Sequence, residues 1–156
     1  MSIEKFVYDS DFQNLMKGHI FETIELIYKK EHYFGITCQI EHVSFSPPLP
    51  TELISTFPEI TLFMLAEYSY ESSKLTTETL SFEAGFGESN FGSIVTIPLL
   101  AIKQVFLEEY LVVLNVAEYT QPIKEEVVKE DTINSMEMLL KNPHNAKLLK
   151  NKKKKL

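Results

Sequence analysis

The sequence predicts one small α+β domain, mostly β, with an amphipathic helix near its N-terminal end. Three observations support this prediction. Apolar residues recur at helical spacing between Phe12 and Ile27, whereas they alternate with other residues over 33–40 and again over Thr79–Phe86. The third observation is size, because 156 residues with 44% hydrophobic side chains can build one core and are too few to expect two.

The first element is a helix over about residues 10–31. Its start is indicated by Asp9-Ser10-Asp11, whose short polar side chains can accept hydrogen bonds from the free N–H groups of a first turn. The apolar residues that follow a period close to 3.6 are Phe12, Leu15, Met16, Ile20, Ile24 and Ile27. A helix with one such apolar face is expected to cover one face of a sheet.

The next segment, residues 33–40, alternates like a half-buried strand and places Cys38 on the apolar side. We therefore expect Cys38 to be a small buried hydrophobe rather than a reactive thiol. The prolines of residues 46–50 stop any strand, because proline lacks a backbone donor. Residues 51–55 can form one helical turn.

From Ile60 onwards the pattern is that of β-structure. The expected strands are Ile60–Tyr68, Ser69–Lys74 (or a continuation of the first), Thr79–Phe86, Gly92–Ile97 and Tyr110–Ala117, with a turn at 87–90. Pro98 suits the first position of a helix, so we expect a short helix from there to about Val105.

Composition and charge divide the chain into a domain over residues 8–118 and a linker with a basic tail over residues 119–156. Residues 132–140 could form a helix in the tail. Residues 146–156 have six Lys and no acid, whereas residues 1–145 have nine Lys and 22 acids, a net charge of −13. The chain has no Arg. The sequence therefore argues against a dedicated nucleic-acid-binding site in residues 1–145 and leaves this function open only for the tail.

The sequence gives little support for catalysis or metal binding. The chain has neither a glycine-rich phosphate loop nor a G-x-S-x-G elbow, and Cys38 has no motif that places His19, His32 or His42 beside it. One Cys and four scattered His do not suggest a zinc site. The acidic pairs at 108–109 and 125–126 are interpreted as solvated charges. We expect no enzyme, no metal or other cofactor, no membrane span, no secretion signal, and a cytoplasmic location.

Two consecutive segments resemble a known family. The two segments are Leu80–Gly87 (LSFEAGFG) and Ile94–Ile102 (IVTIPLLAI). They are similar to segments of the SspB family of protease adaptors, in its divergent, non-enteric branch. Upstream, Tyr33–Thr37, Val43–Ser46 and the region from Leu53 to Pro58 match the same family in order and spacing. The resemblance covers roughly residues 12–117.

The resemblance implies an Sm-like or broken small β-barrel with an N-terminal helix, through which members form homodimers. It implies no catalysis: members bind ssrA-type degradation tags on proteins from stalled ribosomes and deliver them to the ClpX unfoldase of the ClpXP protease. By resemblance, the residues that bind the tag are Leu53, Phe82, Ala84, Gly85 and Phe86. The two Phe and Ala84 could also be plain core residues.

The tail segment Ala146-Lys147-Leu148-Leu149-Lys150 resembles the family's ClpX-docking motif. It departs from the motif because Asn151 and four further Lys follow it, and the alternative interpretation is a solubilising or nonspecific basic tail. The alternative function is an Sm-like or OB-like small barrel that contacts RNA or the ribosome through these lysines.

Overall fold

A computed structural model describes residues 1–121 of the chain, and the expected tail features at 122–156, the docking segment 146–150 included, lie outside this part. Residues Met1–Thr120 form one compact unit. The helices are α1 Ile3–Phe6, α2 Ser10–Lys29, α3 Thr51–Ile54 and α4 Tyr68–Glu71, with 3₁₀ turns η1 Ile40–His42 and η2 Leu99–Ala101. The strands are β1 Phe34–Gln39, β2 Ser44–Ser46, β3 Ile60–Leu65, β4 Lys74–Leu75, β5 Thr79–Phe86, β6 Phe91–Pro98, β7 Ile102–Leu107 and β8 Tyr110–Leu114.

The eight strands form two antiparallel sheets of four. One sheet has the order β3-β1-β7-β8, and the other has the order β2-β6-β5-β4. The mixed α+β class is thus confirmed. The strands are arranged as two separate sheets and do not close into a barrel.

The core lies between the inward faces of the two sheets. Phe34, Ile36 and Val105 from the first sheet join Phe82 and Val95 from the second in one buried cluster. The rings of Phe63 and Phe82 meet edge to face across this core, with centroids 5.7 Å apart. Successive side chains of a strand point to opposite faces of its sheet, so every second residue of these strands points into the core.

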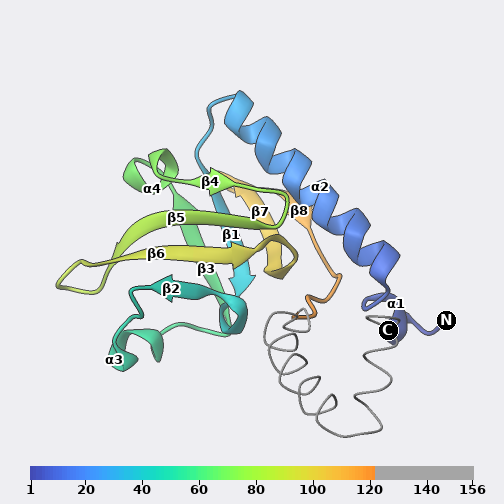
Figure 1. The fold of residues 1–156 in the computed structure, drawn as a ribbon. Helices are drawn as coiled ribbons and strands as arrows, with labels where there is room; N and C mark the ends of the chain where they lie inside the picture. The colour runs from blue at the N-terminus through green and yellow to red at the C-terminus, as the bar shows by residue number, and fades with distance from the viewer. Residues whose placement is uncertain (122–156) are drawn as a thin grey trace, which may run out of the picture. The chain divides into compact units, whose positions relative to one another are not determined.

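Helix α2 completes the core from the side. It runs next to β4 (Figure 1) and also contacts η2, and it buries Ile20, Ile24 and Ile27. Its start is capped as expected, because the Asp9 carboxylate accepts a hydrogen bond from the Phe12 N–H at 3.1 Å. The expected amphipathic helix is confirmed, and it ends at Lys29.

Two expected elements are wrong. The helix expected from Pro98 to Val105 is only the 3₁₀ turn η2, after which the chain forms β7. The bulky residues of β7 pair with β1 in the middle of the first sheet, and this pairing outweighs the local proline signal. The strand expected over 69–74 is replaced by the end of α4 and a turn, and only Lys74 is in a strand, because Glu67 takes a positive φ of 55° and Ser69 bonds back to Ala66.

Candidate functional site

The hairpin of β5 and β6 has a buried face and an open face. Each residue of β5 pairs with one of β6, so that Phe82 lies opposite Val95 and Gly85 lies opposite Gly92. Phe82 and Val95 point inward and are buried, whereas Gly85 and Gly92 lie on the outward, exposed face. The same strand pair therefore supplies both core and surface.

An open groove of about 400 Å³ lies on this hairpin. Its lining residues come from β5 and β6, the turn between them, α4 and the end of β2: Ser46, Pro47, Tyr68, Glu83, Ala84, Gly85, Asn90, Gly92, Ser93 and Ile94. Of the two paired glycines, Gly92 leaves bare backbone at the floor of the groove. A Cβ atom at Gly92 would meet no other atom within 4 Å, so the space above this residue is empty.

The groove is bounded by polar side chains that already have partners. The Tyr68 hydroxyl donates to a Glu83 carboxylate oxygen at 2.7 Å, and this carboxylate raises the pKa of Tyr68. On the β2 side, the Ser93 hydroxyl donates to the Pro47 carbonyl at 2.9 Å. The Asn90 side chain covers Gly85, where any Cβ atom would overlap it. A ligand would thus meet hydrogen-bonding groups around an apolar floor.

One edge of β5 is only partly paired. Strand β4 pairs with β5 at Leu80 and Ser81 alone, and the Glu83 N–H donates to the Ser72 hydroxyl at 2.9 Å. Backbone groups alternate in direction along a strand, so the N–H and C=O of Gly85 point to the same edge as those of Glu83. Within residues 1–121 no strand pairs with that edge beyond Ser81. Strand pairing at this edge therefore ends at Ser81, and the Ser72 hydroxyl takes the place of a strand at Glu83.

The residues expected to bind a tag lie in three different environments. Ala84 and Gly85 line the groove. Phe82 is only 2% exposed, so its side chain is a core residue and offers no surface to a ligand. Phe86 is half-buried against Phe45, Phe57 and Phe63 in an aromatic cluster.

Leu53 lies on α3, at the far end of the hairpin. Its side chain lies against Gly87, where an added Cβ atom would come within 2.7 Å of the Leu53 Cδ2 atom. Gly87 has a positive φ of 74°, which L-residues rarely adopt. Leu53 thus packs on the turn and is not among the residues that line the groove.

Of the ten residues that line the groove, sequence reasoning identified only Ala84 and Gly85. Gly92 and Ile94 could have been found by aligning the two strands about the turn at 87–90, which pairs Gly85 with Gly92 and Glu83 with Ile94. Tyr68 could not have been found in this way. It reaches the groove only because the chain turns into α4, where a strand was expected.

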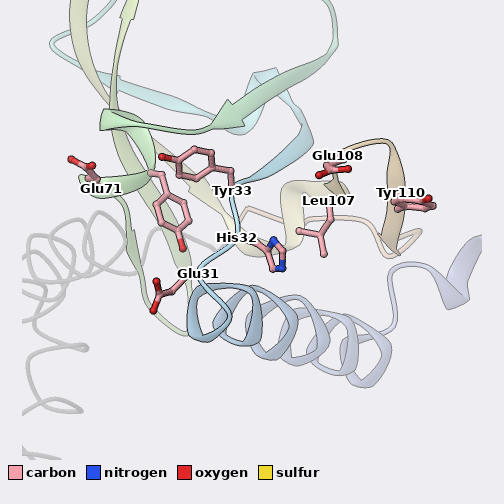
Figure 2. Close-up of a pocket in the computed structure, with 8 residues that line it drawn as sticks. Glu31, His32, Tyr33, Glu71, Leu107, Glu108 and Tyr110 are labelled. Carbon is pink, nitrogen blue, oxygen red and sulfur yellow. The ribbon is translucent and has the colours of Figure 1, made fainter.

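A second, larger cleft of about 770 Å³ lies between the end of α2, α4 and the turn of β7 and β8. Figure 2 shows Glu31 and His32 on one side and Glu108 and Tyr110 on the turn. Burial, and then the nearby carboxylate of Glu31, raises the pKa of Tyr70 in this cleft. Its carboxylates and tyrosines give it an acidic and aromatic character.

Cys38 is buried, as expected. Its side chain is fully enclosed, and burial raises the pKa of the thiol to about 12, so the thiolate that attacks substrates is essentially absent at neutral pH. His42 lies against Tyr119, with ring centroids 4.7 Å apart. Over residues 1–121 no three His, Cys, Asp or Glu side chains are close enough to hold a metal ion together.

Neither a membrane-spanning helix within residues 1–121 nor a matching known protein is found. In the part of the chain that the structure describes, no helix has the length and apolar character needed to cross a bilayer. Comparison of the sequence with models of known protein families and with curated proteins finds no match.

Proposed function

We propose that this protein is a substrate adaptor of the SspB type, which holds an ssrA-type degradation tag in the groove of β5 and β6 and delivers the tagged protein to ClpX in the cytoplasm. The observation that favours this proposal most is Gly92 at the floor of the groove, a glycine with empty space above it. A peptide in extended conformation binds best where its backbone can approach a strand closely.

The edge of β5 beyond Ser81, where no strand of residues 1–121 pairs, supports the same proposal. Hydrogen bonds from a peptide to the backbone of Gly85 would give affinity without regard to sequence, whereas the side chains around the floor would give selectivity. Asn90 and Tyr68 provide polar contacts, and Ile94 provides an exposed apolar one. The proposed role needs binding alone and no chemical step.

The test is the affinity of a fluorescent ssrA-type peptide for the full-length protein, measured by anisotropy. In Gly92→Gln the new side chain enters the empty space of the groove, and we expect at least tenfold weaker binding. Gly18→Gln is the matched control, because a Cβ atom at Gly18 on α2 also meets nothing within 4 Å. Equal affinities of the two variants, or no saturable binding by the wild type, would contradict the proposed groove.

Delivery is a separate part of the proposal and involves residues outside the described part of the chain. Removing residues 146–156 should leave peptide affinity unchanged and abolish the stimulation of ClpXP degradation of a tagged protein. The reason is that a tethered docking segment raises the local concentration of cargo at the unfoldase. Stimulation that survives the truncation would show that this segment does not dock.

A further inference from the structure

The larger cleft, at the end of α2, has three carboxylates that pair with no lysine of residues 1–121. Glu31 follows α2, Glu71 is the last residue of α4, and Glu108 lies in the turn between β7 and β8. All three residues are exposed, and the ion pairs within residues 1–121 join other residues. Lys29 and Lys30 precede Glu31 in the chain, but neither of them lines the cleft. The cleft therefore has negative charge that a ligand can neutralise.

The backbone at this end of α2 is already bonded. The Glu31 N–H donates to the Tyr28 carbonyl at 2.9 Å, and the His32 N–H donates to the Ile27 carbonyl at 3.2 Å. A peptide that binds as an added strand needs free backbone groups. The last turn of a helix instead adds partial negative charge, which favours cations. This part of the cleft therefore suits a cationic ligand that needs no backbone partner.

Tyrosine rings and Leu107 line the same cleft. The rings of Tyr33 and Tyr70 meet edge to face, with centroids 5.0 Å apart. Tyr33 is 46% exposed and Tyr110 is 67% exposed, so a ligand can reach both rings. The face of an aromatic ring attracts a cation and also packs against apolar groups. The cleft thus suits a ligand that is both cationic and aliphatic.

The carboxylates are spread along the cleft and do not converge on one point. Glu31 and Glu71 lie toward one end and Glu108 lies toward the other, with Leu107 between them (Figure 2). Over residues 1–121 no three His, Cys, Asp or Glu side chains are close enough to hold one metal ion. A single compact cation therefore cannot neutralise all three carboxylates, whereas a flexible chain with several ammonium groups can.

We propose that this cleft binds a linear aliphatic polyamine, with ammonium groups at the two ends of the cleft and methylene groups over Leu107 and the tyrosine rings. Its volume of about 770 Å³ is in the range of about 300–1,000 Å³ that is usual for small-molecule sites. The cleft shares no lining residue with the groove of β5 and β6, so this inference goes beyond the proposed function and does not depend on it.

The test is isothermal titration calorimetry of the full-length protein with spermidine near neutral pH. Salt at about 0.15 M screens attraction between exposed charges that are farther apart than about 8 Å. We expect saturable binding of one spermidine per chain, with a Kd below about 1 mM. The double variant Glu71→Gln, Glu108→Gln removes one carboxylate from each end of the cleft and should bind at least about tenfold more weakly. Tyr110→Leu removes one ring and should bind about twofold more weakly or worse.

The matched control is the double variant Asp11→Asn, Glu88→Gln, which also removes two exposed carboxylates. Asp11 lies near the start of α2 and Glu88 lies in the turn between β5 and β6, and neither lines the cleft. This variant should bind spermidine like the wild type. Mg²⁺ at the same concentration as spermidine should not displace it. Circular dichroism checks that each variant is folded, which is expected because all the substituted residues are exposed.

Three results would overturn the proposal: no saturable binding by the wild type up to about 10 mM spermidine, equal affinities of the cleft variant and the control variant, or displacement of spermidine by an equal concentration of Mg²⁺. The second result would mean that spermidine is attracted by the acidic surface as a whole. The affinity for the tag peptide should be the same in the cleft variant as in the wild type, so the polyamine site and the proposed function can fail independently.

Discussion

Replacing Phe82 by Ala should destabilise the protein without removing any surface of the groove. The Phe82 side chain is 2% exposed and contacts Phe63 across the core, with ring centroids 5.7 Å apart. Truncating a buried Phe to Ala costs about 3–5 kcal/mol, because apolar contact is lost and a cavity remains. The edge-to-face ring contact accounts for about 0.5–1.5 kcal/mol of this.

Urea unfolding followed by circular dichroism measures this cost. With a slope of about 2 kcal/mol per molar urea, the midpoint should fall by roughly 1.5–2.5 M while the slope stays the same. Ile94→Ala is the control on the opposite face of the hairpin, since Ile94 is 44% exposed, and it should cost about 1 kcal/mol or less. A cost below about 1 kcal/mol for Phe82→Ala would refute its assignment to the core.

Further predictions concern Cys38, Asn115 and the tyrosines. Because the pKa of the Cys38 thiol is about 12, a thiol reagent at pH 8 should label it only after denaturant is added, and rapid labelling of the native protein would contradict its burial. Asn115→Leu should lower the free energy of unfolding in urea by about 3 kcal/mol or more. The reason is that the buried amide donates to the Leu100 and Ile102 carbonyls and accepts from the Ala117 N–H. A decrease below about 1 kcal/mol would contradict this prediction. Burial is the main cause that raises the pKa of the hydroxyls of Tyr28, Tyr70 and Tyr119. The hydrogen bond to Glu83 is the main cause that raises the pKa of Tyr68. The native state then keeps these protons to higher pH than the unfolded chain does, so the free energy of unfolding should fall as the pH rises above about 10. Absorbance at 295 nm should show that these tyrosines ionise at higher pH than free tyrosine. Ionisation of all tyrosines at the ordinary pH would contradict this prediction.

The sequence alone was sufficient for elements whose pattern is local. The helix at Ser10–Lys29 and the strand at Thr79–Phe86 follow from periodicity, since burial of one face fixes which residues are apolar. The strand Ile102–Leu107 could not be predicted in the same way. Its residues are placed by pairing with β1, which lies more than sixty residues earlier in the chain, and the preceding proline gave a misleading helix signal.

The candidate site was predictable only in part for a related reason. Ala84 and Gly85 were identified from the segment that resembles a family motif, and they do line the groove. Phe82 lies in the same segment and on the same, inward face of the strand as Ala84, but its side chain is only 2% exposed and offers no surface to a ligand. Tyr68 and Asn90 join the groove through α4 and the turn, and no periodicity predicts where those side chains point.

The most direct test of the proposed groove is a nuclear magnetic resonance titration of the full-length, ¹⁵N-labelled protein with an unlabelled ssrA-type peptide. The chain has only five glycines, and they report on separate places: Gly85 and Gly92 on the groove, Gly87 on the turn, Gly35 on the other sheet and Gly18 on α2. We predict that the amide signals of Gly85 and Gly92 shift on saturation while those of Gly18 and Gly35 do not. Saturable shifts confined to Gly18 or Gly35, or no shifts at all, would contradict the proposal that this groove binds the tag.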